Sequence, residues 1–258
     1  MTHEKLILFD FDGVIVDGIN EYWKSSLCAC NKYLLPQSIN LVIPKDETIP
    51  KTFIEIRPWV KFGWEMVLIT HEIIKKNYPL NNTNKGKFLE NYEKNCSQIL
   101  IKNSWDSQIL QKCLDDARKF QIKNDLEQWI SLHRPFNEVL DFIKEATDKG
   151  YKIGVISTKG KVFTSKILDH INIYPDLIFG YEEGSKVEII SRLSNNYNIQ
   201  GFVEDRRKTL INIINNEETN HINCFLAEWG YLKDEDKNNL PKEIKLLKIK
   251  KLEDILAN

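Results

Sequence analysis

The chain has 258 residues, and its 36 Lys plus Arg residues nearly balance its 37 Asp plus Glu residues, which leaves a formal net charge of −1. This balance provides no overall field that would attract nucleic acid or an anionic membrane, so we expect neither as a partner. Hydrophobic residues make up 42% of the chain and charged residues 28%, which excludes a disordered chain and predicts a folded, soluble protein.

The cysteines and the apolar runs indicate a cytoplasmic protein with reduced thiols. The 5 cysteines form no C-x-x-C pair, which argues against a disulfide framework and a zinc knuckle. The apolar run at 6–9 passes directly into Asp10 and is too short for a signal-peptide core. The most apolar interior run, 59–70, is shorter than the ~20 residues that a membrane helix needs.

The first element in chain order is a predicted strand from Lys5 to Asp10. A short apolar run with a charged start and an abrupt acidic end is typical of a strand buried on both faces. We therefore expect this run to be the first strand of a parallel sheet.

The stretch from 18 to 133 has a different pattern. It contains long amphipathic segments at 86–102 and 107–123 without strand signals between them, which predicts a helical insert. The polar segment from Asn77 to Lys87 predicts a surface loop inside this insert.

From Pro135 onward, predicted helices and strands alternate. The predicted helices are 135–148, 161–171, 185–196 and 207–216, and the predicted strands are 151–157, 176–180, 199–203, 222–227 and 245–249, before a C-terminal helical turn. This alternation predicts a doubly wound α/β fold with a parallel sheet. The expected domains are a Rossmann-like core, 1–17 with 134–258, and an inserted helical domain, 18–133.

Two carboxylates follow the first predicted strand. Asp10 and Asp12 are two residues apart, which places both on one face of the strand end, and Gly13 allows a sharp turn away. Ligands of α/β sheets collect at the carboxyl ends of strands. Such a pair binds a hard cation or divides the roles of nucleophile and proton donor. The alternative is an acidic turn of no catalytic significance.

Three later strand ends carry further polar groups. Ser157 and its neighbours offer a hydroxyl and main-chain N–H groups, Lys186 opens a helix, and Glu204 and Asp205 add two carboxylates. Each alone has an ordinary explanation, as a helix cap or a solvated side chain. Together they predict acids for Mg²⁺ with a hydroxyl and an ammonium for phosphate.

The order of these motifs resembles the haloacid dehalogenase superfamily, in the phosphatase-type branch that has a helical cap after the first motif. The resemblance implies that Asp10 is a nucleophile that forms an aspartyl phosphate and that Asp12 is the general acid and base. It further implies that Ser157 holds a phosphoryl oxygen and that Lys186 links the phosphate to Asp10.

The resemblance also implies the cofactor and the substrate contacts. Mg²⁺ is expected on Asp10, Asp205, Glu204 and the main-chain carbonyl of Asp12. The other expected substrate contacts are Gly13, Thr158, Lys159 and Arg57.

Several assignments stay open at this stage. Lys159 is a rival of Lys186, because the latter lacks the Pro that often follows it in the family, and Thr158 is the alternative to Ser157. Asp205 is followed by basic residues where the family often has another acid.

Within the insert, Lys61 and His71 join Arg57 as candidates for reaching the substrate, although Arg57 also suits a helix start. The aromatic residues Trp59, Phe62 and Trp64 are expected to pack in the core of the insert.

The functional hypothesis is a Mg²⁺-dependent phosphatase that acts on a small phosphorylated metabolite. Asp12 favours phosphate ester chemistry, because dehalogenase members lack this second acid. One alternative is a phosphomutase of the β-phosphoglucomutase kind, which returns the phosphoryl group to a sugar. Another is a catalytically quiet member with a binding or regulatory role. The sequence specifies neither the substrate nor an oligomeric state.

Overall fold

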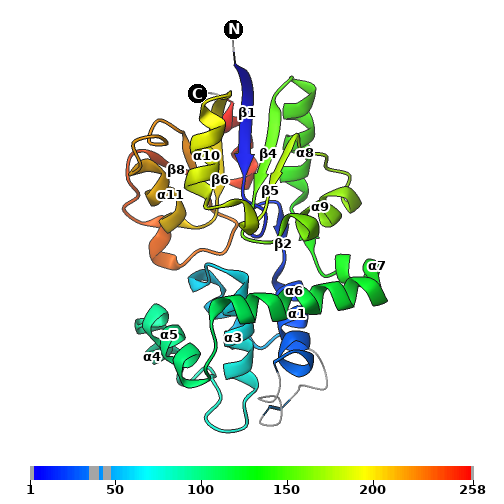
Figure 1. Ribbon diagram of the computed structural model, residues 1–258. Coiled ribbons are helices and arrows are strands. Elements are labelled where there is room, and N and C mark those ends of the chain that lie inside the picture. The colour runs from blue at the N-terminus through cyan, green and yellow to red at the C-terminus, as the bar shows by residue number, and fades with distance from the viewer. Residues whose placement is uncertain (1–2, 35–40, 43–47, 257–258) are drawn as a thin grey trace. The chain divides into compact units, whose positions relative to one another are not determined.

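The computed structural model describes residues 3–34, 41–42 and 48–256. The chain divides into two compact units. The core unit comprises Met1–Asp17 with Arg134–Asn258, and the helical unit comprises Gly18–His133. Figure 1 shows the helices and strands of both units.

The core unit contains a 6-stranded parallel sheet, which confirms the predicted fold class. From one edge to the other, the strands are β5 (Leu177–Phe179), β4 (Lys152–Ile156), β1 (Glu4–Phe9), β6 (Tyr197–Glu204), β7 (Cys224–Ala227) and β8 (Ile244–Leu247). The chain runs outward from β1 to β5 and then returns to β6 on the other side of β1. The reversal of strand order therefore lies between β1 and β6, where ligands bind in sheets of this type.

Both faces of β1 are covered, which explains why its sequence is a continuous apolar run. Leu6 and Leu8 belong to the same buried cluster as residues of α10 (Lys186–Ser194) and α11 (Arg207–Ile214). On the opposite face, the ring of Phe9 lies 6.3 Å from that of Phe142 in α8 (Asn137–Asp148). Alternate side chains thus enter different layers, as the two-residue period of a strand requires.

The remaining elements of the core unit are α9 (Lys161–His170), the short 3-10 helices η3 (Tyr181–Glu183) and η4 (Asp234–Lys237), and the C-terminal η5 (Ile249–Ile255). The predicted strands and helices after residue 150 are confirmed, with shifts at their ends. The largest strand shifts, of two residues, are in β6, which begins at Tyr197, in β7, which begins at Cys224, and in β8, which ends at Leu247.

The helix predicted at 135–148 is confirmed as α8, but it begins at Asn137 and not at Pro135. Pro135 belongs to β3 (Arg134–Pro135), which pairs in antiparallel fashion with β2 (Val16–Asp17). The next residue, Phe136, is still extended, and its N–H donates to the carbonyl of Ile15 at 3.0 Å. This pairing of distant segments overrides the local preference of Pro for a first helical turn.

The helical unit consists of α1 (Ile19–Lys32), α2 (Lys51–Ile56), η2 (Arg57–Trp59), α3 (Gly63–Ile74), α4 (Lys85–Glu90), α5 (Tyr92–Lys102), α6 (Ser107–Asn124) and α7 (Leu126–Ile130). The helix predicted at 107–123 is confirmed as α6. The single segment predicted at 86–102 is two helices, because Asn91 leaves helical geometry with φ −132° and ψ 46°. Asn favours such interruptions, since its side chain competes for main-chain hydrogen bonds.

The expectation that Trp59, Phe62 and Trp64 form the core of this unit is wrong. Phe62 is 37% exposed, and both tryptophans are only half-buried. Between Phe62 and Trp64, Gly63 is the buried residue, and a Cβ there would lie 2.9 Å from Leu114 Cδ2. Because a glycine occupies the point of closest approach, its aromatic neighbours lie at the periphery.

A buried ion pair joins α1 and α6. Glu21 and Arg118 side chains are both 0% exposed. Arg118 Nε lies 2.8 Å from Glu21 Oε1, and Nη2 lies 3.0 Å from Oε2, which is a two-pronged geometry. No helix within the described ranges of the chain is long and apolar enough to cross a membrane.

We predict that Arg118→Met destabilises the protein by about 3–5 kcal/mol, because it leaves the Glu21 carboxylate buried without its main partner. Urea unfolding measures the change. The matched control is Lys112→Met, which removes an exposed ion pair with Asp116 and should cost less than about 1 kcal/mol. Equal losses in the two variants would contradict this interpretation of the buried pair.

Candidate active site

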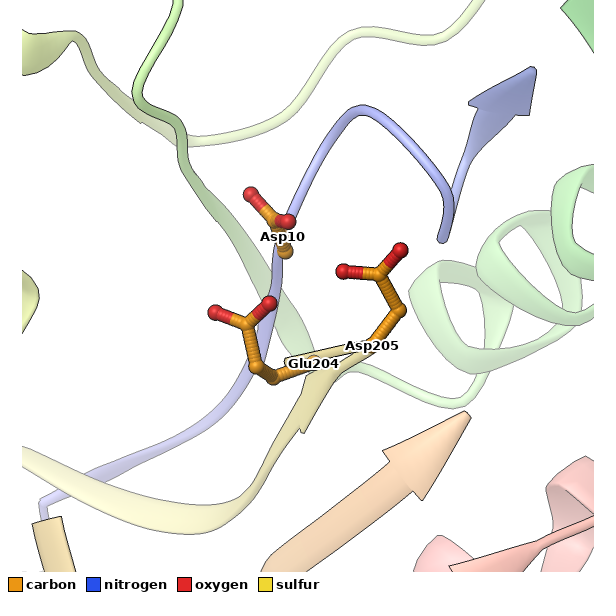
Figure 2. Close-up of side chains that lie close together, drawn as sticks. All are labelled: Asp10, Glu204 and Asp205. Atoms are coloured by element: carbon orange, nitrogen blue, oxygen red, sulfur yellow. The ribbon is translucent and has the colours of Figure 1, made fainter. Parts of the chain in front are cut away.

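Three buried carboxylates meet where β1 and β6 end. The strands pair Phe9 with Val203, and the N–H of Asp10 donates to the carbonyl of Val203 at 2.8 Å. This register brings Asp10 beside Glu204 and Asp205, and one oxygen from each of the three carboxylates lies within 4.8 Å of the others. Figure 2 shows the three side chains gathered at the strand ends.

Lys186 places its ammonium between two of these carboxylates. Its Nζ lies 2.6 Å from Asp10 Oδ1 and 2.7 Å from Glu204 Oε2. Lys186 is the first residue of α10, a helix start fixed by Ser185, whose hydroxyl accepts from the N–H of Glu188. The structure therefore joins Lys186, which the sequence left open, to the acidic cluster.

Burial and mutual repulsion shift the titration of the cluster. Burial, reinforced by Glu204 and opposed by Lys186, raises the pKa of Asp10 from 3.8 to about 7. Burial also raises the pKa of Glu204, where Lys186 acts in the opposite direction. Burial alone would lower the pKa of Lys186, but the two carboxylates outweigh it and raise that pKa. The group brings three carboxylates and one ammonium together, and carboxylate oxygens are the ligands that a hard cation prefers.

Asp12 has a different cationic neighbour. Asp12 is buried, and its Oδ1 lies 3.5 Å from Nζ of Lys159, whose side chain is fully buried. The two lysines that competed as candidates in the sequence thus occupy separate places, with Lys186 at Asp10 and Lys159 at Asp12.

Ser157 and Thr158 follow β4, the neighbour of β1 on its other side. Ser157 is buried and its N–H donates to the carbonyl of Phe179 at 2.9 Å. The Ser157 hydroxyl accepts from the N–H of Lys159 at 2.9 Å, whereas Thr158 is half-buried. The strand order thus brings this hydroxyl and the acidic cluster to the same edge of the sheet.

Gly13 cannot be replaced without displacing the cluster. Its φ of +92° is one that other residues rarely adopt, and a Cβ there would lie 2.0 Å from Asp205 Oδ2. Gly13 therefore permits the tight turn after Asp12 and the close approach of Asp205.

Sequence reasoning missed the main-chain donors to Glu204 and Asp205, the two acids where β6 ends. The N–H of Arg206 donates to Glu204 Oε1 at 3.1 Å, and the N–H of Tyr231 donates to Asp205 Oδ2 at 2.8 Å. Tyr231 lies just beyond the carboxyl end of β7, the next strand of the sheet. This position could have indicated Tyr231 from the sequence, because any residue that follows a strand at this edge of the sheet is a candidate for the site.

The candidates in the helical unit have local partners. His71 is 7% exposed, its ring packs against Trp105 with centroids 4.9 Å apart, and Nδ1 lies 3.2 Å from Glu72 Oε1. The guanidinium of Arg57 lies over the ring of Tyr22 at 5.5 Å, while Lys61 is exposed. Contact of Arg57 with a substrate stays a prediction.

We predict that Asp10→Asn stabilises the metal-free protein more at about pH 8 than at about pH 4. The raised pKa of Asp10 means that the folded state holds this proton more tightly than the unfolded state. The wild type therefore loses stability as the pH rises from about 4 through 7, by roughly 2–4 kcal/mol, and Asn has no such proton.

Urea unfolding in EDTA at both pH values measures this difference. Asp148→Asn, at an exposed helix end, is the control and should show little pH-dependent gain. A gain for Asp10→Asn that does not change with pH would contradict the effect of burial on Asp10.

We predict that Gly13→Ala weakens binding of Mn²⁺, used as a probe of the acidic cluster, and destabilises the core unit by more than about 1 kcal/mol. Its Cβ would overlap the Asp205 carboxylate. Gly86→Ala in α4 is the control, since a Cβ there meets nothing within 4 Å. Calorimetric titration and urea unfolding test both variants, and cation affinity in Gly13→Ala equal to that of the wild type would refute the prediction.

Comparison with known proteins finds similarity in structure. Neither a protein-family model nor a curated protein sequence matches this chain. A predicted phosphatase from Clostridium acetobutylicum aligns with 100% of both chains, at 17% identity and a TM-score of 0.59. A haloacid dehalogenase-like family hydrolase from Streptococcus pneumoniae aligns over 98% of this chain and 96% of its own, at 15% identity and a TM-score of 0.56.

Protein tyrosine kinase A from Mycobacterium tuberculosis also aligns, over 99% of both chains, with 14% identity and a TM-score of 0.54. Proteins that are named for different activities therefore share this architecture, and the fold alone does not specify the reaction. The sheet order and these full-length similarities confirm the predicted resemblance at the level of structure: the chain has the fold of the haloacid dehalogenase superfamily.

Proposed function

We propose that this protein is a Mg²⁺-dependent phosphatase that hydrolyses a small phosphorylated metabolite through an aspartyl phosphate on Asp10. The observation that carries the proposal is the contact of the Lys186 ammonium with Asp10, 2.6 Å away, inside a cluster of three buried carboxylates. The similarity in structure to a predicted phosphatase supports it.

The donor set suits Mg²⁺. Asp10, Glu204 and Asp205 offer carboxylate oxygens, which are the ligands that hard cations prefer, and Asp12 would add its main-chain carbonyl. Burial raises the pKa of Asp10 and of Glu204, and a divalent cation beside them would offset the unfavourable burial of their negative charge. When bound, Mg²⁺ would supply neutralisation of the phosphoryl oxygens.

The residues divide the reaction into two displacements. An Asp10 carboxylate oxygen attacks phosphorus, the bond from phosphorus to the ester oxygen breaks, and Asp12 donates a proton to the leaving oxygen. Asp12 then accepts a proton from water as the water oxygen attacks phosphorus. The bond from Asp10 to phosphorus breaks, which releases inorganic phosphate and restores the carboxylate.

The remaining candidates would bind the transferred group and the rest of the substrate. Lys186 offers a positive charge, and Ser157 and Thr158 offer hydroxyls to phosphoryl oxygens. Lys159, 3.5 Å from Asp12, would orient this acid and contribute positive charge at the substrate phosphate. Gly13 would allow the main chain to approach the phosphate closely.

The helical unit is proposed as the cap that excludes water and selects the substrate, with Arg57 as its candidate contact to an anionic or polar group.

We predict that the wild type releases inorganic phosphate from p-nitrophenyl phosphate, or from members of a panel of sugar and glycolytic phosphates, with Mg²⁺ but not with EDTA. Asp10→Asn should lower kcat by about 10⁴-fold or more, because it removes the nucleophile while keeping its volume. Asp12→Asn should lower it by ~10²–10⁴-fold, as expected for loss of a general acid and base. Asp148→Asn serves as the control with full activity.

The same assay separates the alternatives. Turnover by Asp10→Asn at the wild-type rate, or turnover indifferent to EDTA, would refute the mechanism. Conversion of glucose 1-phosphate to glucose 6-phosphate with little free phosphate would replace the phosphatase with a phosphomutase. Binding of phosphate esters without turnover on any of them would favour a binding or regulatory role.

A further inference from the structure

The loop at 228–232, which follows β7, connects the acidic cluster to the strand pair where the chain leaves and re-enters the core unit. We propose that Tyr231 in this loop is a positioning residue: it holds the Asp205 carboxylate through its main chain and anchors that main chain through its phenol on Asp17. The inference rests on the proposed function, since it concerns the carboxylate group that would bind the cation.

The hydrogen bonds of Tyr231 point to two different places. Its N–H donates to Asp205 Oδ2 at 2.8 Å, and its phenol donates to Asp17 Oδ1 at 2.6 Å. The other Asp17 oxygen accepts from Arg134 Nη2 at 2.8 Å. Asp17 and Arg134 are register partners in the β2–β3 pair. One residue therefore spans the distance from the acidic cluster to the strands that delimit the core unit.

The residues around Tyr231 and Asp205 are closely packed. A Cβ on Gly13 would lie 2.7 Å from Tyr231 Cδ2, and a Cβ on Gly230 would lie 2.2 Å from Asp205 Cβ and 2.7 Å from the carbonyl oxygen of Gly13. In addition, Trp229 Nε1 donates to the carbonyl of Val14 at 3.1 Å. The loop is thus in close contact with both Asp205 and the turn that follows Asp12.

Fixing one oxygen of Asp205 fixes the direction of the other. A carboxylate whose Oδ2 accepts from a main-chain N–H cannot rotate freely, so Oδ1 keeps one orientation. Partners of this kind, which orient ligands from outside the ligand set, typically change metal affinity by about 10–100-fold. The hydrogen bond from the phenol to the charged Asp17 acceptor holds the main chain that makes this contact.

The test is Tyr231→Phe, which removes only the phenol oxygen and keeps the ring and the main-chain N–H. We expect Mn²⁺, titrated by calorimetry and followed by electron paramagnetic resonance, to bind roughly 3–30-fold more weakly, below the range for losing a direct partner of a ligand. We also expect amide hydrogen exchange to become faster at 228–232 and in the segment 10–17. The control is Tyr174→Phe, which removes the phenol of a residue that is 73% exposed and should change neither readout.

A double-mutant cycle with Asp17→Ala tests the route of the effect. Both single variants should weaken Mn²⁺ binding, and the double variant should be little worse than Asp17→Ala alone, because both substitutions remove the hydrogen bond between Tyr231 and Asp17 and only Asp17→Ala also removes the contact with Arg134. Additive losses would overturn the inference. So would a Tyr231→Phe protein that is less thermostable but binds Mn²⁺ with wild-type affinity, which would make Tyr231 merely structural.

The proposed function and the role of Tyr231 can be refuted separately. A wild-type protein that binds no Mn²⁺ would overturn the proposed function, and hydrogen exchange would then decide alone whether Tyr231 holds the segment 10–17. A wild type that binds Mn²⁺ next to an unaffected Tyr231→Phe variant would leave the proposed function intact and refute the role of Tyr231.

Discussion

The candidate site depends on the ion pairs that the Lys186 ammonium makes with Asp10 and Glu204. Burying carboxylates is costly, and the cost is offset only where opposite charge lies close by with good geometry. Burial, reinforced by the Glu204 carboxylate, outweighs the opposing effect of Lys186 and raises the pKa of Asp10 to about 7. The site is therefore arranged to take up positive charge, and this property links the fold to the proposed chemistry.

The parallel sheet creates this arrangement from segments that are far apart in sequence. Asp10 follows β1, Glu204 ends β6, and α10 begins at Lys186 after the edge strand β5. Because the order of strands reverses between β1 and β6, the strand ends there open onto a common edge. Both apolar faces of β1 pack against helices, and this packing fixes the position of Asp10 at the end of the strand. The stability of the sheet and the geometry of the site therefore have the same origin.

Much of this could be predicted from the sequence, because the signals were local or ordered along the chain. The buried strand before Asp10 and the later alternation of strands and helices could be predicted from the spacing of hydrophobic residues, which differs between strands and helices. The motif order then indicated which strand ends would meet. Choosing between Lys159 and Lys186 required the structure, since both are single basic residues at the ends of loops and only three-dimensional placement shows which acid each one contacts.

Other features depended on contacts that no local pattern encodes. Pro135 is extended because it pairs with Val16, more than a hundred residues away in sequence. The aromatic residues around Gly63 are peripheral because the glycine takes the point of contact with Leu114. Tyr231 acts on Asp205 through a main-chain N–H, which any residue type except proline provides, so its identity gave no signal.

The central claim is that Asp10 carries the phosphoryl group during turnover. The most direct measurement is acid quenching of the wild type during turnover of its best substrate, followed by borohydride reduction, which converts an aspartyl phosphate to homoserine, and peptide mass spectrometry. The account predicts homoserine at the position of Asp10, and none in a sample prepared without substrate. Rapid turnover with no modification at that position, or with the phosphoryl group on another residue, would contradict it.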